Sequence, residues 1–158
     1  MRAIFKGITE ERDGFRIRPM TEEDLDEVSR LENLYFSDPW SKNSYAASLQ
    51  SEDALFLCIF EGDELLGYCG VYNACGDGDI CDVAVKESHR GRGIGRRMLE
   101  VLMDLGRRMG IRNYTLEVRV SNAGAIALYE KLGFESAGIR PGFYEKPKED
   151  ALIMWKYS

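Results

Sequence analysis

A strand, a glycine-rich loop and an amphipathic helix follow one another in mid-chain, and this succession constrains the fold more than any other feature. The apolar run DICDVAV (79–85) predicts a strand, and residues 94–110 repeat apolar side chains at helical spacing. RGRGIG (90–95) joins the two, and NYTLEVRV (113–120) follows as another strand. Because such a unit links its strands through a crossover helix, the sheet must contain at least one parallel pair.

The other segments place this unit in one α/β (α+β) domain, which suits a chain of 158 residues. Further strands are predicted at FRIRPM, ALFLCIF, ELLGYCGVYN, FESAGIR and ALIMWK, and further helices at 21–36, 42–50 and 121–133. The predicted order is β-α-α-β-β-β-α-β-α-β-β, a mixed, mostly antiparallel sheet flanked by helices. We expect residues 15–158 to form the domain, residues 1–14 to be an extension or an extra strand, and PGFYEKPKED (141–150) to be a loop.

Composition narrows the classes of partner. A formal net charge of −6 argues against nucleic acid and against an anionic membrane surface. The four cysteines contain no Cys-x-x-Cys pair and His89 is the only histidine, so no metal site is expected. Cys58 and Cys69 fall in apolar runs and are predicted core residues. With no recognisable targeting or membrane segment, we expect a cytoplasmic protein with reduced thiols, a monomer or a weak dimer.

The RGRGIG loop lies where a strand gives way to a helix, and there backbone N–H groups and the helix dipole favour an anion. Glycines let the backbone approach a phosphate closely, and Arg90, Arg92, Arg96 and Arg97 add positive charge. Neither a P-loop motif nor the dinucleotide motif Gly-x-Gly-x-x-Gly is present. The loop therefore favours a phosphate-bearing ligand over RNA, with a flexible turn carrying solvated arginines as the alternative.

The motif Arg-x-x-Gly-x-Gly at Arg90, Gly93 and Gly95, within DVAVKESHRGRGIGRRML, resembles the acetyl-CoA signature of the Gcn5-related N-acetyltransferase (GNAT) superfamily. FSDPWS, LEVRVSNAGAIALYEKLGF and EDALIMWK resemble segments of its ribosomal-protein-alanine N-acetyltransferases, the RimI-type members. The resemblance covers residues 15–156. It implies a GNAT fold with acetyl-CoA as cosubstrate, bound by Val83, Ala84, Val85, Arg90, Gly91, Arg92, Gly93, Ile94, Gly95, Arg96 and Asn122.

Acetyl transfer to an amine requires a base for the ammonium, stabilisation of the carbonyl oxygen and an acid for the departing thiolate. By strand alternation Glu117 lies on the face opposite Leu116 and Val118. On this pattern alone, Glu117 could equally face the solvent and pair with Arg119. The resemblance makes Glu117 the general base. We expect the oxyanion donor to be a backbone N–H of the strand 82–85.

Tyr129 follows Asn122 by almost two helical turns, so both side chains point along one face, separated by roughly 10 Å. On spacing alone Tyr129 is equally a core residue. The resemblance makes it the general acid and gives Asn122 a contact with the pantetheine of coenzyme A. Trp40, Phe143 and Tyr144 are candidates for substrate contact, although Trp40 also suits a core position after Pro39.

The resemblance implies transfer to the N-terminal alanine of small-subunit ribosomal protein eighteen, so the expected partner is a ribosomal protein's N-terminal peptide. One alternative keeps the activity but changes the acceptor to a polyamine, an antibiotic, an amino acid or another protein N-terminus. A second is a regulatory module that binds coenzyme A without turnover. A third is an RNA-binding module that uses the arginine-glycine loop.

Overall fold

The strand–loop–helix unit forms the middle of an eight-stranded sheet in the computed structural model, which describes residues 1–158. The strand order is β1-β2-β3-β4-β5-β6-β8-β7. The β5–β6 pair is parallel, as the crossover requires, and the other pairs are antiparallel. The predicted mixed, mostly antiparallel sheet and the predicted order of its elements from residue 15 onward are confirmed.

The strands, in chain order, are β1 (Glu10–Arg12), β2 (Phe15–Pro19), β3 (Ala54–Glu61), β4 (Glu64–Ala74), β5 (Asp77–Val85), β6 (Asn113–Arg119), β7 (Glu135–Glu145) and β8 (Lys148–Lys156). The α-helices are α1 (Leu25–Tyr35), α2 (Lys42–Gln50), α3 (Ile94–Arg108) and α4 (Ala123–Lys131). Short 3₁₀ helices cover Ala3–Phe5, Glu22–Asp24 and Glu87–His89. Within residues 1–14, β1 pairs with β2 at the edge of the sheet.

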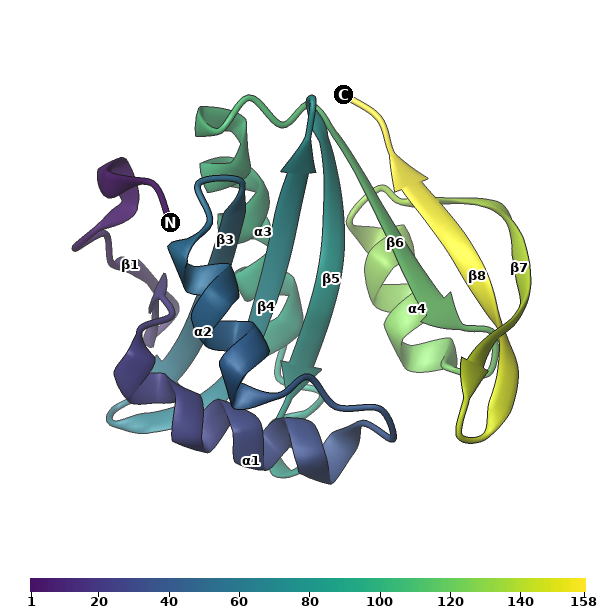
Figure 1. Ribbon diagram of the computed structural model, residues 1–158, viewed down its shortest axis with the longest axis horizontal. Coiled ribbons are helices and arrows are strands. Elements are labelled where there is room, and N and C mark those ends of the chain that lie inside the picture. Colours follow the sequence, from purple (N-terminus) through teal and green to yellow (C-terminus); the bar gives the residue numbers. More distant parts are fainter.

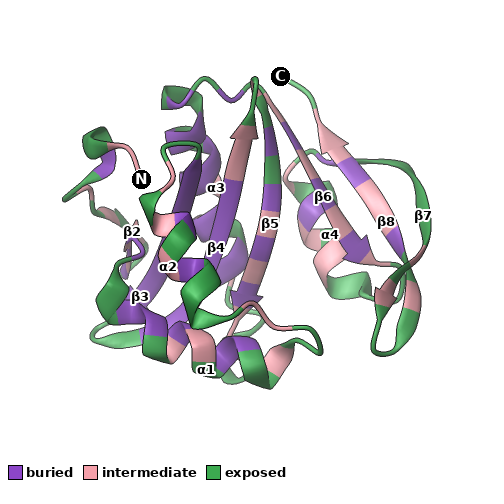
Figure 2. Cartoon of the chain, in the orientation of Figure 1, coloured by how far each residue is buried: buried purple, intermediate pink, exposed green.

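Helices cover both faces of the sheet (Figure 1). One core cluster lies under α1 and α2, and a larger one lies between the sheet and α3 and includes residues of α4 and β8. Buried residues concentrate on β3, β4 and the inner face of α3 (Figure 2). Cys58 and Cys69 are buried, as predicted. The centre of the sheet is therefore a rigid platform for the loop that follows β5.

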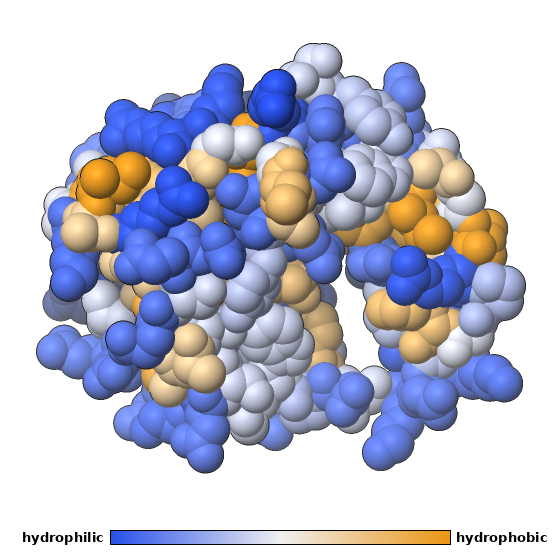
Figure 3. All heavy atoms as spheres, turned by 45° about the horizontal axis from the view of Figure 1, so that its top comes forward, coloured by the Kyte–Doolittle hydropathy of each residue, from blue (hydrophilic) through white to orange (hydrophobic).

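The parallel strands β5 and β6 separate soon after they meet. Only Asp77–Asp79 of β5 pairs with β6, opposite Asn113–Thr115. Beyond this point the strands diverge (Figure 1). The space-filling view shows the molecule hollowed between the body that carries β3–β5 and the lobe that carries β6–β8 (Figure 3). The divergence leaves one backbone edge of β5 without a strand partner.

The prediction of a loop at 141–150 is wrong. β7 continues to Glu145 and β8 already begins at Lys148, so only Lys146 and Pro147 lie between the two strands. A register shift between Arg140 and Tyr144 places Pro141–Phe143 in a bulge. Because β7 is an edge strand, Pro141 can lack an N–H without breaking a hydrogen bond that the sheet requires. Pro and Gly therefore bend this strand without ending it.

The predicted helix at 21–36 begins with a 3₁₀ turn, and α1 proper starts at Leu25. Thr21 and Asp24 form a capping box, with the Thr21 N–H donating to the Asp24 carboxylate at 2.8 Å. Arg18 donates two further hydrogen bonds to that carboxylate. These contacts fix where α1 begins and how it leaves β2.

Candidate active site

The divergence of β5 and β6 opens a cleft of about 640 Å³ between β5, the glycine loop, α3 and α4. All the predicted cofactor-binding residues except Arg92 line it, and so does Tyr129. Tyr35 and Phe36, at the end of α1, line it as well. Glu117, Trp40, Phe143 and Tyr144 do not. The fold thus gathers the predicted cofactor-binding residues and Tyr129 in a single cleft. Glu117 and the predicted substrate contacts lie outside the residues that line it.

The glycine loop presents free amides to this cleft. Gly93 is the N-cap of α3, adopts a φ of +72° and offers no side-chain cap, and no acidic residue lies in the first turn. The first N–H groups of α3 therefore have no side-chain partner from the cap. A Cβ at Gly93 would lie 2.5 Å from Nη1 of Arg97, a side-chain end that can shift, so it is the left-handed φ that requires glycine. These donors and this space fit a pyrophosphate.

Two exposed arginines line the cleft. The Arg90 Nε donates to the Val85 carbonyl at 3.1 Å, and its guanidinium lies 4.9 Å from the centre of the Tyr35 ring. Arg96, on the first turn of α3, also lines the cleft and makes an exposed ion pair with Glu100 at 3.4 Å. Both side chains are exposed, so they can reorient toward an anion.

The other two arginines of this region are engaged elsewhere. The Arg92 guanidinium pairs with Glu61 at 2.7 Å, which explains its absence from the cleft wall. Arg97 pairs with Asp13 at 2.8 Å and donates to the Gly93 carbonyl at 3.0 Å. Arg92 and Arg97 therefore hold the loop against β1–β3 rather than facing a ligand.

The open edge of β5 faces the same cleft. The Lys86 N–H donates to the Leu66 carbonyl of β4 at 2.8 Å. Because backbone groups alternate in direction along an antiparallel strand, Val85 and Val83 direct theirs away from β4. The Arg90 contact with the Val85 carbonyl from the cleft side agrees with this direction. The backbone groups of Val83 are therefore directed toward the space between β5 and β6.

Glu117 lies on the β6 side of the divergence, with 24% of its side chain exposed. Burial and the charge of Asp79 raise the pKa of Glu117, whereas Arg140 opposes the shift. The alternative partner, Arg119, pairs instead with Glu149 at 3.2 Å. Glu117 is therefore a half-buried carboxylate that no ion pair with its own strand neutralises.

Tyr129 and Asn122 lie at opposite ends of α4. The Tyr129 ring packs 6.0 Å from Phe134, the residue is 7% exposed, and no hydrogen bond within the protein engages its hydroxyl. Burial is the main cause that raises the pKa of Tyr129, so the hydroxyl keeps its proton. Asn122 Oδ1 accepts the Ala125 N–H at 3.2 Å, which leaves the amide NH₂ free for the cleft.

The predicted substrate contacts fall on two different elements. On β7, the half-buried Tyr144 ring lies 4.4 Å from the Arg119 guanidinium, and the exposed Phe143 ring stands perpendicular to it at 5.0 Å. Trp40, after α1, packs 5.3 Å from Tyr45, against the core cluster under α1 and α2. Burial and the charge of Glu117 raise the pKa of Tyr144, which places that hydroxyl in the field of the predicted base.

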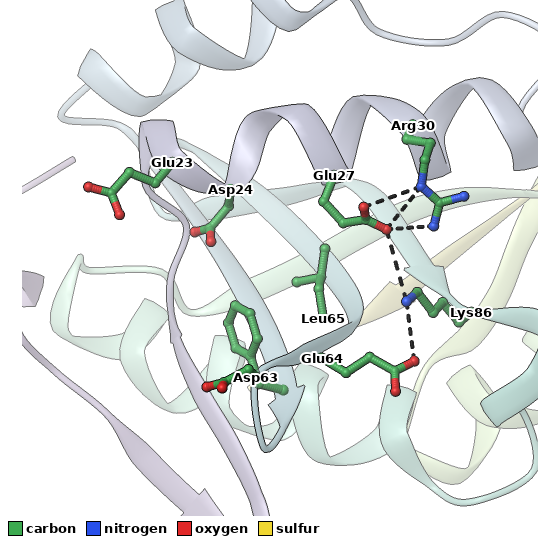
Figure 4. Close-up of a pocket in the computed structure, with 9 residues that line it drawn as sticks. Glu23, Asp24, Glu27, Arg30, Asp63, Glu64, Leu65 and Lys86 are labelled. Carbon is green, nitrogen blue, oxygen red and sulfur yellow. Dashed lines mark hydrogen bonds and ion pairs between the residues drawn. The ribbon is translucent and has the colours of Figure 1, made fainter.

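A second cavity, of about 520 Å³, lies between α1 and the β3–β4 turn (Figure 4). Several of its charged side chains form ion pairs: Lys86 lies 3.2 Å from Glu64 and 3.9 Å from Glu27, which also pairs with Arg30. His89 contacts the same Glu64 carboxylate at 3.2 Å. These contacts lie near the base of the loop, and His89, which lines the first cleft, joins the two cavities through Glu64.

Sequence reasoning missed one group of side chains. Glu32 and Asp82 are buried between α1, α2 and β5, with 2% and 8% of their surface exposed. The signal for Glu32 was available, because it follows Leu25 by seven residues and Val28 by four and so belongs to the apolar stripe of its helix. No such signal exists for Asp82, whose orientation depends on a bulge in β5.

No cluster of three or more His, Cys, Asp or Glu side chains in this structure is arranged to hold a metal ion. None of its helices combines the length and apolar character that a membrane crossing requires.

Residues 25–134 match the model of the acetyltransferase (GNAT) family. A Bacillus subtilis protein provisionally named a ribosomal protein bS18-alanine N-acetyltransferase is 39% identical over 88% of this chain and 93% of its own length. The Escherichia coli ribosomal protein bS18-alanine N-acetyltransferase is 34% identical over 83% of this chain and 89% of its own. The crystal structure of the E. coli enzyme superposes with a TM-score of 0.81, at 32% identity over 90% of this chain and 93% of that one.

Proposed function

This chain belongs to the acetyltransferase (GNAT) family, and we propose that it acetylates the α-amino group of the N-terminal alanine of ribosomal protein bS18. It is an acetyl-CoA-dependent N-acetyltransferase. The observation that carries the mechanism is the opening between β5 and β6, which has the glycine loop on one wall, Tyr129 on another and Glu117 beyond its β6 side. The relatives named above support the choice of acceptor.

The glycine loop and the open edge of β5 bind acetyl-CoA, which supplies the acetyl thioester. Free N–H groups at the start of α3, together with Arg90 and Arg96, hold its pyrophosphate. Val83 and Val85 offer backbone groups to the extended pantetheine, and the Asn122 NH₂ donates to one of its amides. These contacts orient the thioester toward the β6 side of the cleft.

Three groups of the chain then serve the chemistry. Glu117 accepts a proton from the incoming α-ammonium, and its raised pKa brings it closer to the pKa of that amine. A backbone N–H of β5, at Val83, stabilises the negative charge that develops on the carbonyl oxygen. The Tyr129 hydroxyl, which keeps its proton because it is buried, donates that proton to the departing sulfur. The nitrogen–carbon bond forms as the carbon–sulfur bond breaks. The ammonium loses two protons in all, one to Glu117 before attack and one as the amide forms, while the departing thiolate gains one from Tyr129.

The acceptor peptide approaches from the side of Trp40, Phe143 and Tyr144. The net charge of −6 favours a basic peptide over an acidic one. The bulge at Pro141–Phe143 turns the aromatic pair out of the regular ladder of β7 and β8, which makes their rings available for contact.

The proposal is tested with purified protein, acetyl-CoA and a basic peptide that begins with alanine and contains an internal lysine. Mass spectrometry of the fragments locates the acetyl group, and the same peptide with a blocked N-terminus is the matched control. Acetylation at the α-amine of the free peptide alone is the expected result. Acetylation of the lysine in both peptides, or of polyamines only, would overturn the acceptor assignment.

A further inference from the structure

Four polar side chains from four elements meet beneath the α1–α2 segment: Glu32 of α1, Tyr45 of α2, Tyr68 of β4 and Asp82 of β5. We call them the buried cluster. Both tyrosines are fully buried, and neither carboxyl takes part in an ion pair. Two acidic groups are thus packed together in the core without a neutralising cation, an arrangement that is costly when both are ionised.

The contacts of the cluster converge on Glu32 and Tyr45. Oε1 of Glu32 lies 2.6 Å from the Tyr68 hydroxyl and 2.9 Å from the Tyr45 hydroxyl. The Tyr45 hydroxyl also contacts Oδ2 of Asp82. The second oxygen of Glu32, Oε2, accepts the backbone N–H of Trp40 at 3.0 Å. Glu32 is therefore the acceptor at the centre, and Asp82 reaches it through Tyr45.

The contacts of the cluster need one more proton than its two tyrosine hydroxyls supply. Three oxygen–oxygen contacts join the four side chains, and each needs a proton. A phenol hydroxyl carries one proton and can donate one hydrogen bond, so the two tyrosines serve two contacts. The third proton must come from a carboxyl group. Tyr45 can donate to only one of the two carboxyl groups that it contacts. Glu32 also accepts from Tyr68 and from the Trp40 N–H, and these donors stabilise its ionised form, so we place the third proton on Asp82, which donates to Tyr45 while Tyr45 donates to Glu32.

The surroundings of Asp82 agree with this count. Burial and the charge of Glu32 raise the pKa of Asp82 to about 8, against the smaller opposing effect of its contact with Tyr45. The titratable groups around it are Glu32, Tyr45, Tyr68 and Cys81, and its charge also acts on Cys69 and Tyr129. All of these are acids, so nothing in the set stabilises a second negative charge.

The cluster joins the two walls between which an acceptor must enter. Asp82 directly precedes Val83, whose backbone faces the cleft. Glu32 holds the Trp40 N–H, and the segment 36–41 between α1 and α2 carries both Phe36 at the cleft and the Trp40 ring on Tyr45. A change in the charge of the cluster would therefore move that segment relative to β5.

We propose that Glu32 and Asp82 share one proton through Tyr45, and that this proton positions segment 36–41 beside β5 for binding of the acceptor peptide. Loss of the proton to solvent leaves two adjacent carboxylates, which repel and release the segment. Glu32 and Asp82 are positioning residues: they act on the peptide through Trp40 and its neighbours, and the glycine loop that binds acetyl-CoA is not involved. The inference about peptide binding rests on the proposed function.

The proton itself is tested without any acceptor. In a Trp155→Phe background Trp40 is the only tryptophan, and its fluorescence is followed from pH 6 to pH 10. We expect a transition near pH 8 that disappears in Asp82→Asn, because asparagine donates to Tyr45 as the protonated acid does but cannot ionise. The matched control is Asp38→Asn, an exposed carboxyl of the same segment, which should keep the transition. A transition that persists in Asp82→Asn, or none in the parent protein, would overturn the shared proton.

The positioning role is tested by the KM for the alanine-initiated peptide at pH 6.5 and pH 9. Ionisation of the peptide amine affects the KM of every variant equally. The KM of the wild type divided by the KM of Asp82→Asn therefore reports the effect of the buried cluster alone. We expect this ratio to rise about tenfold with pH, as for loss of a charged hydrogen bond, while the KM for acetyl-CoA stays the same. An unchanged ratio would refute the positioning role.

Should Asp82→Asn fail to fold, Tyr45→Phe breaks the bridge instead and should also abolish the fluorescence transition. Absence of peptide turnover at every pH would count against the proposed acceptor, whereas the fluorescence titration would still decide whether the proton is shared.

Discussion

The guanidinium of Arg140 on β7 lies 3.6 Å from the Glu117 carboxylate on β6, measured from Nη2 to Oε1, although β8 separates the two strands. Asp79 of β5, on the other side of β6, acts on the same carboxylate with the opposite sign. The protonation of Glu117 is thus balanced between a cation and an anion drawn from the two neighbouring regions of the sheet. Arg140 is half exposed and can leave when a substrate ammonium arrives.

This balance predicts opposite shifts in the pH dependence of two variants. Arg140→Gln removes the charge that stabilises ionised Glu117, so its pKa rises and the acid limb of the kcat/KM profile moves to higher pH. Asp79→Asn removes a repelling charge and moves that limb to lower pH. The profiles of both variants are measured beside Arg108→Gln, an exposed control on α3. Shifts of the same sign in both variants would contradict the electrostatic account.

Replacing Glu117 by Gln should separate catalysis from cofactor binding. The amide cannot accept the proton, so turnover should fall by about a hundredfold or more. Acetyl-CoA binding, measured by calorimetry, should not change, because Glu117 lies outside the cleft wall. Glu130→Gln, on the exposed side of α4, is the matched control. Full activity of Glu117→Gln would assign the base to another group.

Tyr129→Phe tests the acid with little risk to the fold. The phenol makes no hydrogen bond within the protein, so its removal should leave the melting temperature almost unchanged. Turnover should fall by about a hundredfold, since the thiolate then departs without its proton donor. An acetyl donor with a more acidic thiol should recover part of the loss. A variant with reduced stability but full activity would make Tyr129 a packing residue only.

Gly93→Ala should weaken acetyl-CoA binding. Alanine is strained at a φ of +72°, by about 1–2 kcal/mol, and its Cβ would displace Arg97. We expect the Kd for acetyl-CoA to rise at least about fivefold, measured by calorimetry. Gly110→Ala introduces similar strain at a φ of +86° but lies away from the cleft, so it should lower stability without changing the Kd. Equal Kd values for both variants would exclude the loop from binding.

The buried cluster also predicts how stability depends on pH. The pKa of Asp82 is about 8 in the folded protein and lower when unfolded, so between these values the folded state retains a proton that the unfolded state has lost. Its contribution to stability is present below the unfolded pKa, declines as the pH rises toward 8 and is constant above. The melting temperature of Asp82→Asn should therefore fall less than that of the wild type between pH 5 and pH 9. A parallel decline in both proteins would contradict the raised pKa.

Periodicity predicted most of the fold because the helices and central strands have strong apolar patterns. The helix α3 and the strand β6, for example, show clear three-to-four-residue and two-residue repeats. The β7–β8 hairpin was not predicted because Pro141 and Gly142 usually mark a loop, and only pairing with β8 keeps them within a strand. The boundary of the strand was therefore decided by tertiary contacts.

In the candidate site, too, features set by neighbouring residues could be predicted and features set by distant contacts could not. That the residues of the glycine loop line one cleft could be predicted because strand, loop and helix are contiguous in sequence. That Arg92 pairs with Glu61 could not, since the two are 31 residues apart. The buried Glu32 and Asp82 were missed for a related reason: a carboxyl is expected at the surface unless its partners are known, and these partners come from three other elements.

The central claim is that the opening between β5 and β6 directs acetyl transfer to a protein's N-terminal alanine. Its most direct test is the kcat/KM of the wild-type protein for an alanine-initiated bS18 peptide, compared with a free polyamine and with the same peptide blocked at its N-terminus. The account predicts that the free peptide is preferred by about a hundredfold or more, as expected when a site matches one acceptor amine. Equal or greater efficiency with the polyamine or the blocked peptide would contradict it.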